Sequence, residues 1–197
     1  MSSLTAGASL PPAHVLLSEI GARRLSPVDL VDALLEQIRT QDRKLHAFVE
    51  VYAEEARLAA EAADKAIRSG HVIGPLHGIP IALKDLIEIE GRVTTGGSEV
   101  WRNRVSRYTA TLARRLIAAG LIVIGKTHTV EFAMGGWGTN QYRGTPWNPW
   151  DPATERTPGG SSSVSGGCRS GFWSVSDRRR SCPRRGKPVS RSAHSPA

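Results

Sequence analysis

Cysteine is scarce in this sequence, and its two copies, Cys168 and Cys182, both follow residue 163. Residues 1–163 contain none, which excludes a disulfide framework, a cysteine zinc site and a cysteine nucleophile from that part of the chain. Histidines are too scattered for a metal-ligand or Ser–His motif; they are His14, His46, His71, His77, His128 and His194. We therefore expect no metal, no cofactor and no histidine-based hydrolase.

Long apolar runs are also missing. Residues 1–25 lack the basic start and the apolar stretch of a signal peptide, and no segment approaches the length that crosses a bilayer. These absences predict a cytoplasmic protein without a membrane partner.

Acidic residues are rare only near the end of the sequence. The formal net charge is +8, but residues 164–197 hold seven arginines and one lysine against Asp177 alone, so the rest is nearly neutral. A basic segment of this kind suggests a nucleic-acid or other anion binder, and accidental basic coding is the alternative. No nucleic-acid fold motif accompanies the segment, so we expect no nucleic-acid partner.

Residues 164–197 also contain no leucine and no isoleucine. Such a segment buries too little apolar surface to offset the entropy of ordering it. We therefore predict a partial domain over residues 1–163 and a disordered basic tail, rich in serine, arginine and proline, over residues 164–197.

The pattern in residues 1–163 alternates helices and strands. Ser26 and Pro27 begin a predicted helix over residues 26–40, and a short strand is expected over residues 47–51. An alanine-rich helix over residues 52–69 ends at Gly70.

Two further apolar strands, IALK at residues 81–84 and LIVIG at residues 121–125, flank a predicted helix over residues 110–119. This order predicts an α/β fold with a parallel sheet, whose sites form beyond the carboxyl ends of the strands. Lys84 and Lys126 both stand at such ends.

Lys84 has two interpretations. A lysine that closes an apolar strand is partly desolvated, which favours a neutral amine able to accept a proton. The alternative is an ion pair with Asp85 or an exposed strand end. Lys126 lies in GLIVIGKT (120–127), a formal match to a phosphate-binding loop. The apolar residues of this segment are the strand itself, so a strand-end lysine is favoured.

Two segments combine glycines with serine: TTGGS at residues 94–98 and TPGGSSS at residues 157–163. Each is typical of a turn. Alternatively, the glycines let the backbone approach a substrate closely, with N–H groups and a hydroxyl facing it.

Three segments together resemble the amidase signature family in order and spacing. They are GPLHGIPIALKDLIEIEGRVTTGG (74–97), IAAGLIVIGKTHTVEFAMGGWGTN (117–140) and NPWDPATERTPGGSSS (148–163). The resemblance implies the N-terminal portion of the family's α/β/α fold, with a mixed, largely parallel central sheet flanked by helices.

The family cleaves amide bonds with a Ser–Ser–Lys triad, so the resemblance implies an enzyme acting on a small-molecule carboxamide. By motif position, Lys84 corresponds to the base. Ser161 corresponds to the bridging serine, which in the family is held by a cis peptide bond. The glutamine-hydrolysing component of glutamyl-tRNA(Gln) amidotransferase shares the same signature and is an alternative. Trp137 and Tyr142 are candidates for substrate contact or for simple packing.

The nucleophile is not found where the family has it. The family places it some two dozen residues after the bridging serine, in a Thr-Asp-x-Gly-Gly-Ser segment, but no Gly-Gly-Ser follows Ser161. Ser98 in TTGGS also follows two glycines, but its position corresponds to a different loop of the family, so we assign it no catalytic role. We hypothesise that a frameshift near residue 164 truncates an amidase and leaves this chain inactive.

Overall fold

The computed structural model describes residues 10–149, 153–157 and 174–175 of the 197-residue chain. Its elements, in chain order, are α1 (Ala13–Gly21), α2 (Pro27–Leu45), β1 (Phe48–Val51), α3 (Ala53–Ser69), β2 (Pro80–Lys84), α4 (Thr111–Ala118), β3 (Ile122–Thr127), the short 3-10 helix η1 (Glu131–Ala133) and β4 (Ser174–Val175). The predicted helices and strands after residue 25 are confirmed in type and, within a few residues, in extent.

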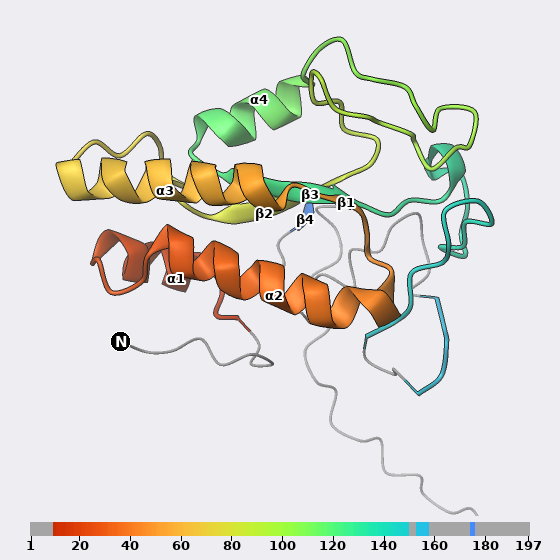
Figure 1. The fold of residues 1–197 in the computed structure, drawn as a ribbon, viewed down its shortest axis with the longest axis horizontal. Helices are drawn as coiled ribbons and strands as arrows, with labels where there is room; N and C mark the ends of the chain where they lie inside the picture. The colour runs from red at the N-terminus through yellow and green to blue at the C-terminus, as the bar shows by residue number, and fades with distance from the viewer. Residues whose placement is uncertain (1–9, 150–152, 158–173, 176–197) are drawn as a thin grey trace, which may run out of the picture.

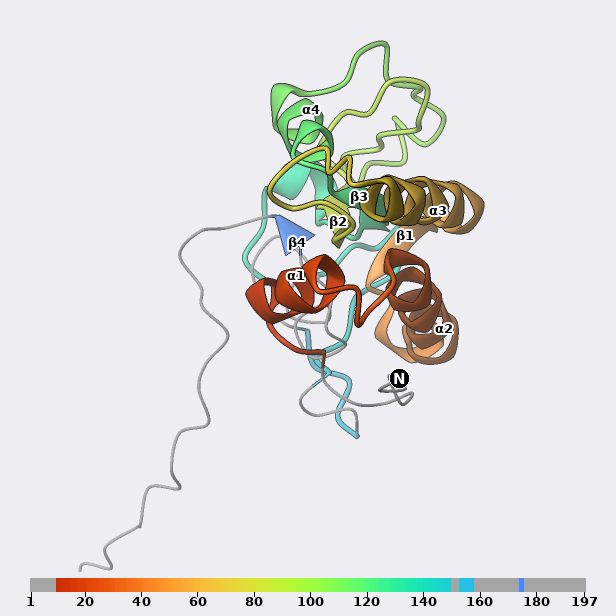
Figure 2. The same ribbon diagram turned by 90° about the vertical axis from the view of Figure 1, so that its left-hand side faces the viewer.

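The strands form one mixed sheet in the order β1–β3–β2–β4. β2 is parallel to both β3 and β4, whereas β1 is antiparallel to β3. α1 and α2 lie on one side of the sheet and α4 on the other (Figures 1 and 2). The α/β class with a largely parallel sheet is thus confirmed.

The register between β2 and β3 contains one irregularity. Ile81 pairs with Val123, but the next residue, Ala82, pairs with Gly125, so Ile124 is an extra residue on β3. Gly125 lies so close to β1 that an added Cβ would collide with the carbonyl oxygen of Glu50. The absence of a side chain at Gly125 therefore lets β1 pair closely with β3.

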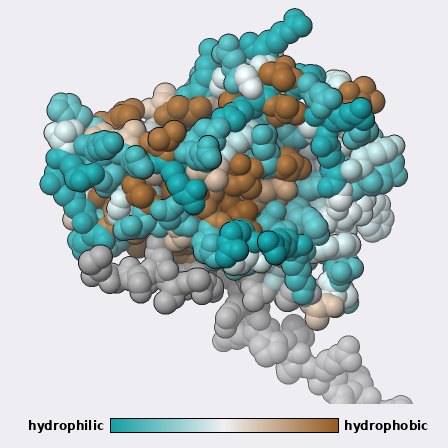
Figure 3. Space-filling model, viewed as in Figure 1, coloured by the Kyte–Doolittle hydropathy of each residue, from teal (hydrophilic) through white to brown (hydrophobic). Residues whose placement is uncertain are grey.

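The hydrophobic core lies between the sheet and its helices. α2 contributes the predicted apolar stripe, of which Leu30 and Val31 are wholly buried, and β3 contributes the equally buried Ile124. α3 packs against α2 and β3. Hydrophobic residues gather in the middle of the face shown in Figure 3, within a hydrophilic surround. Together these contacts fix the sheet, and with it the ends of its strands.

Two helical features differ from expectation. α2 continues to Leu45 rather than ending near Thr40, because buried Leu45 anchors a last turn whose exposed residues are polar. α1 was not predicted: Pro12 precedes it without a side-chain cap, and Leu16 and Ile20 are its only buried residues. In the described residues, no helix has the length and apolar character needed to cross a membrane.

The first turn of α2 supplies a testable contribution to stability. The Ser26 hydroxyl accepts a hydrogen bond from the Val28 N–H at 3.1 Å and donates one to Asp64 at 3.2 Å. We expect Ser26→Ala to lower the free energy of unfolding by about 1 kcal/mol, because the N-cap is lost. Urea unfolding measures this. Asp64→Ala is the control: it removes the second bond and the ion pair of Asp64 with Arg68 but leaves the N-cap bond. An equal loss in both variants would contradict the assignment of the effect to the N-cap.

Candidate functional site

Lys84 is the last residue of β2, and its side chain is almost entirely buried, with 7% of its surface exposed. Burial lowers the pKa of its amine from the ordinary value of 10.5, because water no longer solvates the charged form. An exposed strand end is therefore excluded for Lys84. Its surroundings favour the neutral amine, which is the form that accepts a proton.

Asp85 directly follows Lys84, and its carboxylate is buried on the face of the sheet opposite to Lys84. It accepts hydrogen bonds from the N–H of Thr95 at 3.2 Å and from the Thr95 hydroxyl at 2.5 Å. It also forms an ion pair with Lys126, whose Nζ lies 3.6 Å from Oδ1. The negative charge next to Lys84 in sequence thus has a cationic partner on β3.

Lys126 is completely buried. Its Nζ donates hydrogen bonds to the carbonyl oxygen of Ile87 at 2.7 Å and to the Thr94 hydroxyl at 2.8 Å. Burial lowers the pKa of Lys126, and the Asp85 carboxylate opposes that shift. The residues before it form β3 rather than a loop, so the phosphate-binding match is excluded and a strand-end lysine is confirmed.

The backbone N–H groups of the TTGGS segment are engaged within the protein. Thr95 donates to the Asp85 carboxylate, Gly96 to the Asp85 carbonyl, Gly97 to the Thr95 hydroxyl and Ser98 to the Thr95 carbonyl. The buried Ser98 hydroxyl donates to Glu131 at 2.7 Å. These bonds correct the interpretation in which the segment turns its N–H groups and hydroxyl toward a substrate: it is a structural turn.

A cavity of about 450 Å³ borders this turn and is lined by residues of the MGGWGTN segment. Trp137 and Tyr142 line it and are 79% and 53% exposed. Asn140, which also lines the cavity, joins it to the TTGGS turn by donating hydrogen bonds to the carbonyl oxygens of Gly97 and Thr129. In the described part of the chain, both aromatic side chains are thus open to contact rather than packed in the core.

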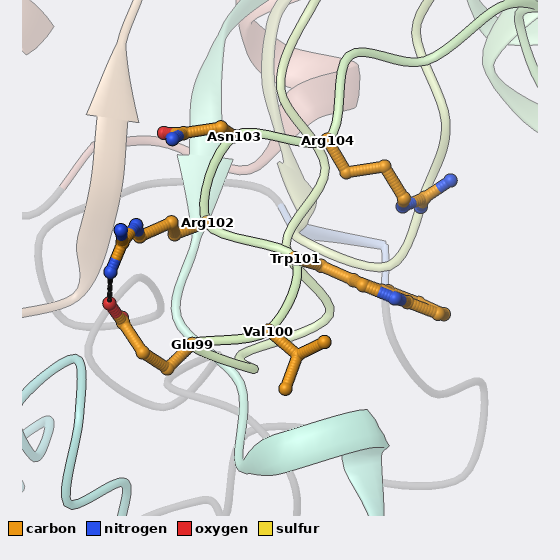
Figure 4. Close-up of a pocket in the computed structure, with 6 residues that line it drawn as sticks. All are labelled: Glu99, Val100, Trp101, Arg102, Asn103 and Arg104. Atoms are coloured by element: carbon orange, nitrogen blue, oxygen red, sulfur yellow. Dashed lines mark hydrogen bonds and ion pairs between the residues drawn. The ribbon is translucent and has the colours of Figure 1, made fainter.

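A second hollow, of about 590 Å³, is formed by residues 99–104. Trp101 and Arg104 extend to one side of this loop, with the guanidinium 4.4 Å from the centre of the Trp101 ring (Figure 4). Arg102 pairs with Glu99 on the other side at 2.7 Å. A single loop supplies this lining, and it includes none of the predicted site residues.

Ser161 and the rest of TPGGSSS beyond Thr157 lie outside the described residues. The predicted pairing of Ser161 with Lys84, and the cis peptide bond, therefore stay predictions. Residues 164–197 also lie outside them, except Ser174–Val175, which pair with β2. Sequence reasoning missed the roles of Asp85 and Thr94. The only available signal was that both lie within the first family-like segment.

The fold closely resembles solved amidases. A chain from a structure titled as a vestigial protein complex that reveals the evolutionary origins of an s-triazine catabolic enzyme superimposes with a TM-score of 0.74 at 36% identity, over 79% of this chain and 34% of that one. The peptide amidase from Stenotrophomonas maltophilia superimposes with a TM-score of 0.70 at 34% identity, over 77% of this chain and 32% of that one.

Curated relatives include the A-type component of glutamyl-tRNA(Gln) amidotransferase from several bacteria. The relative from Mycolicibacterium gilvum is 40% identical over 161 residues, which are 81% of this chain and 32% of the relative. That of Anaeromyxobacter dehalogenans is 43% identical over 143 residues, 73% of this chain and 29% of the relative. The chain thus spans about a third of the length of these relatives. The model of the family described as Amidase matches residues 29–168. This chain therefore belongs to the amidase family.

Proposed function

We propose that residues 1–163 carry the base and relay half of a Ser–Ser–Lys hydrolase that acts on the carbon–nitrogen bond of a small carboxamide. Lys84 is the base and Ser161 the bridging serine. The observation that carries the proposal is the buried Lys84 amine at the carboxyl end of a parallel strand, where burial lowers its pKa. Substrates of α/β proteins bind at this edge of the sheet.

In this mechanism the neutral Lys84 amine takes a proton through the Ser161 hydroxyl from a second serine. That serine attacks the amide carbon, and the C–N bond breaks as the proton passes to the leaving nitrogen, which departs as ammonia or an amine. Water then hydrolyses the resulting ester. Backbone N–H groups beside the nucleophile stabilise the oxyanion. No Gly-Gly-Ser follows Ser161 in the sequence. We therefore propose that the 197-residue polypeptide lacks the nucleophile and the oxyanion-binding turn.

The Lys84 assignment is testable without turnover. Competitive labelling with trace acetic anhydride across pH, read by mass spectrometry of the Lys84 peptide, gives the pKa of this amine. We expect it to lie below 10.5 in the folded chain and to return to the ordinary lysine value in urea. An ordinary pKa in the folded chain would contradict the assignment.

The same pKa shift has a consequence for stability. Since the unfolded chain binds a proton at Lys84 more tightly than the folded chain, stability rises with pH between the lowered pKa and 10.5. We expect Lys84→Met to flatten this rise in urea unfolding, whereas exposed Lys65→Met leaves it unchanged. The pKa of buried Lys126 is also lowered, so Lys126 adds to the rise in stability with pH. Lys84→Met is therefore expected to reduce the rise rather than abolish it.

An amidotransferase function of the A-type component is the second candidate, and the names of the curated relatives favour it. Two chimeras separate the candidates. One joins residues 1–163 to the remaining part of the Mycolicibacterium gilvum relative, and the other joins them to that of the peptide amidase. Activity of the first alone supports the second candidate, and activity of the second alone contradicts it.

We also propose that residues 164–197 are an out-of-frame basic tail rather than part of the catalytic domain. Their composition supports this. Translating the other two frames of the coding DNA after codon 163 tests it: the proposal fails if neither encodes an Asp-x-Gly-Gly-Ser segment. Anion binding by the tail is the competing function, and it requires salt-sensitive affinity that a chain ending at Ser163 loses.

A further inference from the structure

The two strand-end lysines lie on opposite faces of the sheet. Lys84 pairs in register with Thr127, whereas Lys126 pairs with Leu83. Side chains of paired residues share a face and alternate along each strand. Lys126 is therefore on the face opposite to Lys84, and its 3.6 Å ion pair shows that the Asp85 carboxylate lies on the Lys126 face.

Several acids face Lys126. Asp85 is in contact with it, and Glu88 after β2 and Glu50 on β1 raise its pKa from farther away. Glu88 has its own partners, because Arg104 approaches it at 2.5 Å and the Ser106 hydroxyl donates to it. Among the described residues, Lys126 is the cation that forms an ion pair with the Asp85 carboxylate.

Asp85 immediately follows Lys84, so its carboxylate is the negative charge nearest to the amine in sequence. An acid that is close enough to bind a lysine favours the protonated form of that lysine. The protonated form cannot act as a base. The location of the Asp85 charge therefore bears directly on whether Lys84 accepts a proton.

We propose that Lys126 is a positioning residue that binds the Asp85 carboxylate on one face of the sheet and so keeps this negative charge from the Lys84 amine on the other face. Its hydrogen bonds to Ile87 and Thr94 hold the Lys126 ammonium at that point. The inference rests on the proposed function, because it concerns how Lys84 keeps its neutral form. Lys126 acts through Asp85 and contacts no reacting atom.

Three variants of the full chain test this role, with the pKa of Lys84 as the readout by competitive labelling. Lys126→Gln keeps N–H donors but removes the charge, and it is expected to raise the Lys84 pKa by about one unit. Asp85→Asn leaves Lys126 as an uncompensated cation and lowers the Lys84 pKa. The double variant, with neither charge, returns it to the parent value. Lys65→Gln on the surface of α3 is the matched control and changes nothing.

The outcomes are distinguishable. A role in stability alone predicts that all variants share the parent pKa at Lys84, which overturns the role of Lys126. An ordinary Lys84 pKa in the parent chain overturns the proposed function as well. If Lys126→Gln does not fold, as circular dichroism reports, Asp85→Asn and the double variant decide, after the same check of folding. Equal Lys84 pKa values in those two then overturn the inference.

Discussion

The purified 197-residue polypeptide is expected to hydrolyse carboxamides at a rate about a million-fold below that of an intact serine hydrolase, the loss that follows removal of a serine nucleophile. In the proposed mechanism, Lys84 and Ser161 move a proton but form no bond to the substrate carbon. Ammonia release from simple amides measures the rate. Labelling by a fluorophosphonate reports an activated serine, and we expect none.

The matched control is the chimera of residues 1–163 with the remaining part of the Mycolicibacterium gilvum relative, which supplies a nucleophile. If residues 1–163 hold a competent base, this protein hydrolyses its amide substrate, and Lys84→Met abolishes the activity while Lys65→Met does not. A serine acyl-enzyme formed by the 197-residue polypeptide itself would contradict the prediction of inactivity.

The second large effect is expected at Gly97, where Gly97→Ala should lower the free energy of unfolding by about 3 kcal/mol. Gly97 has a φ of +73°, which costs a residue with a Cβ about 1–2 kcal/mol. The new Cβ would also lie 2.6 Å from the Thr129 carbonyl oxygen and 2.9 Å from the Asn140 amide nitrogen. The Thr129 carbonyl belongs to the backbone and cannot move aside without a shift of the chain, so overpacking adds to the conformational strain at Gly97.

Gly91→Ala is the control for backbone strain alone. Its φ of +77° is nearly the same, but no atom lies within 4 Å of an added Cβ. We therefore expect it to cost only about 1–2 kcal/mol. Urea unfolding of both variants measures the difference. Equal losses would show that the contact of the TTGGS turn with Thr129 and Asn140 contributes little to stability.

The fold was predictable where local pattern and burial agree. The apolar stripe that begins at Val28 and the run that ends at Lys84 have the periods of a buried helix face and a buried strand, and both elements are present. α1 escaped prediction because only Leu16 and Ile20 are buried in it and no capping side chain precedes it. Two fully buried residues in nine leave almost no periodic signal.

The site was only partly predictable, for a different reason. The burial of Lys84 was predictable from the apolar strand before it, whereas its expected role as the base came only from the resemblance to the family. The partner of Asp85 was not, because sequence adjacency suggests Lys84, whereas alternation along the strand places neighbours on opposite faces. Lys126 is far away in sequence, and its place beside Leu83 depends on a register that no local pattern encodes.

The extra residue in β3 decides which residue of β2 stands beside Lys126. Ile124 is skipped between the pairs Ile81–Val123 and Ala82–Gly125. If the ladder instead ran without interruption from the first of these pairs, Ile124 would take the place of Gly125, and Lys126 would pair with Lys84. Two amines would then lie side by side on one face, where a positive charge on either amine would disfavour protonation of the other. The bulge thus places the two lysines on opposite faces of the sheet, so that Lys126 rather than Lys84 shares a face with the Asp85 carboxylate.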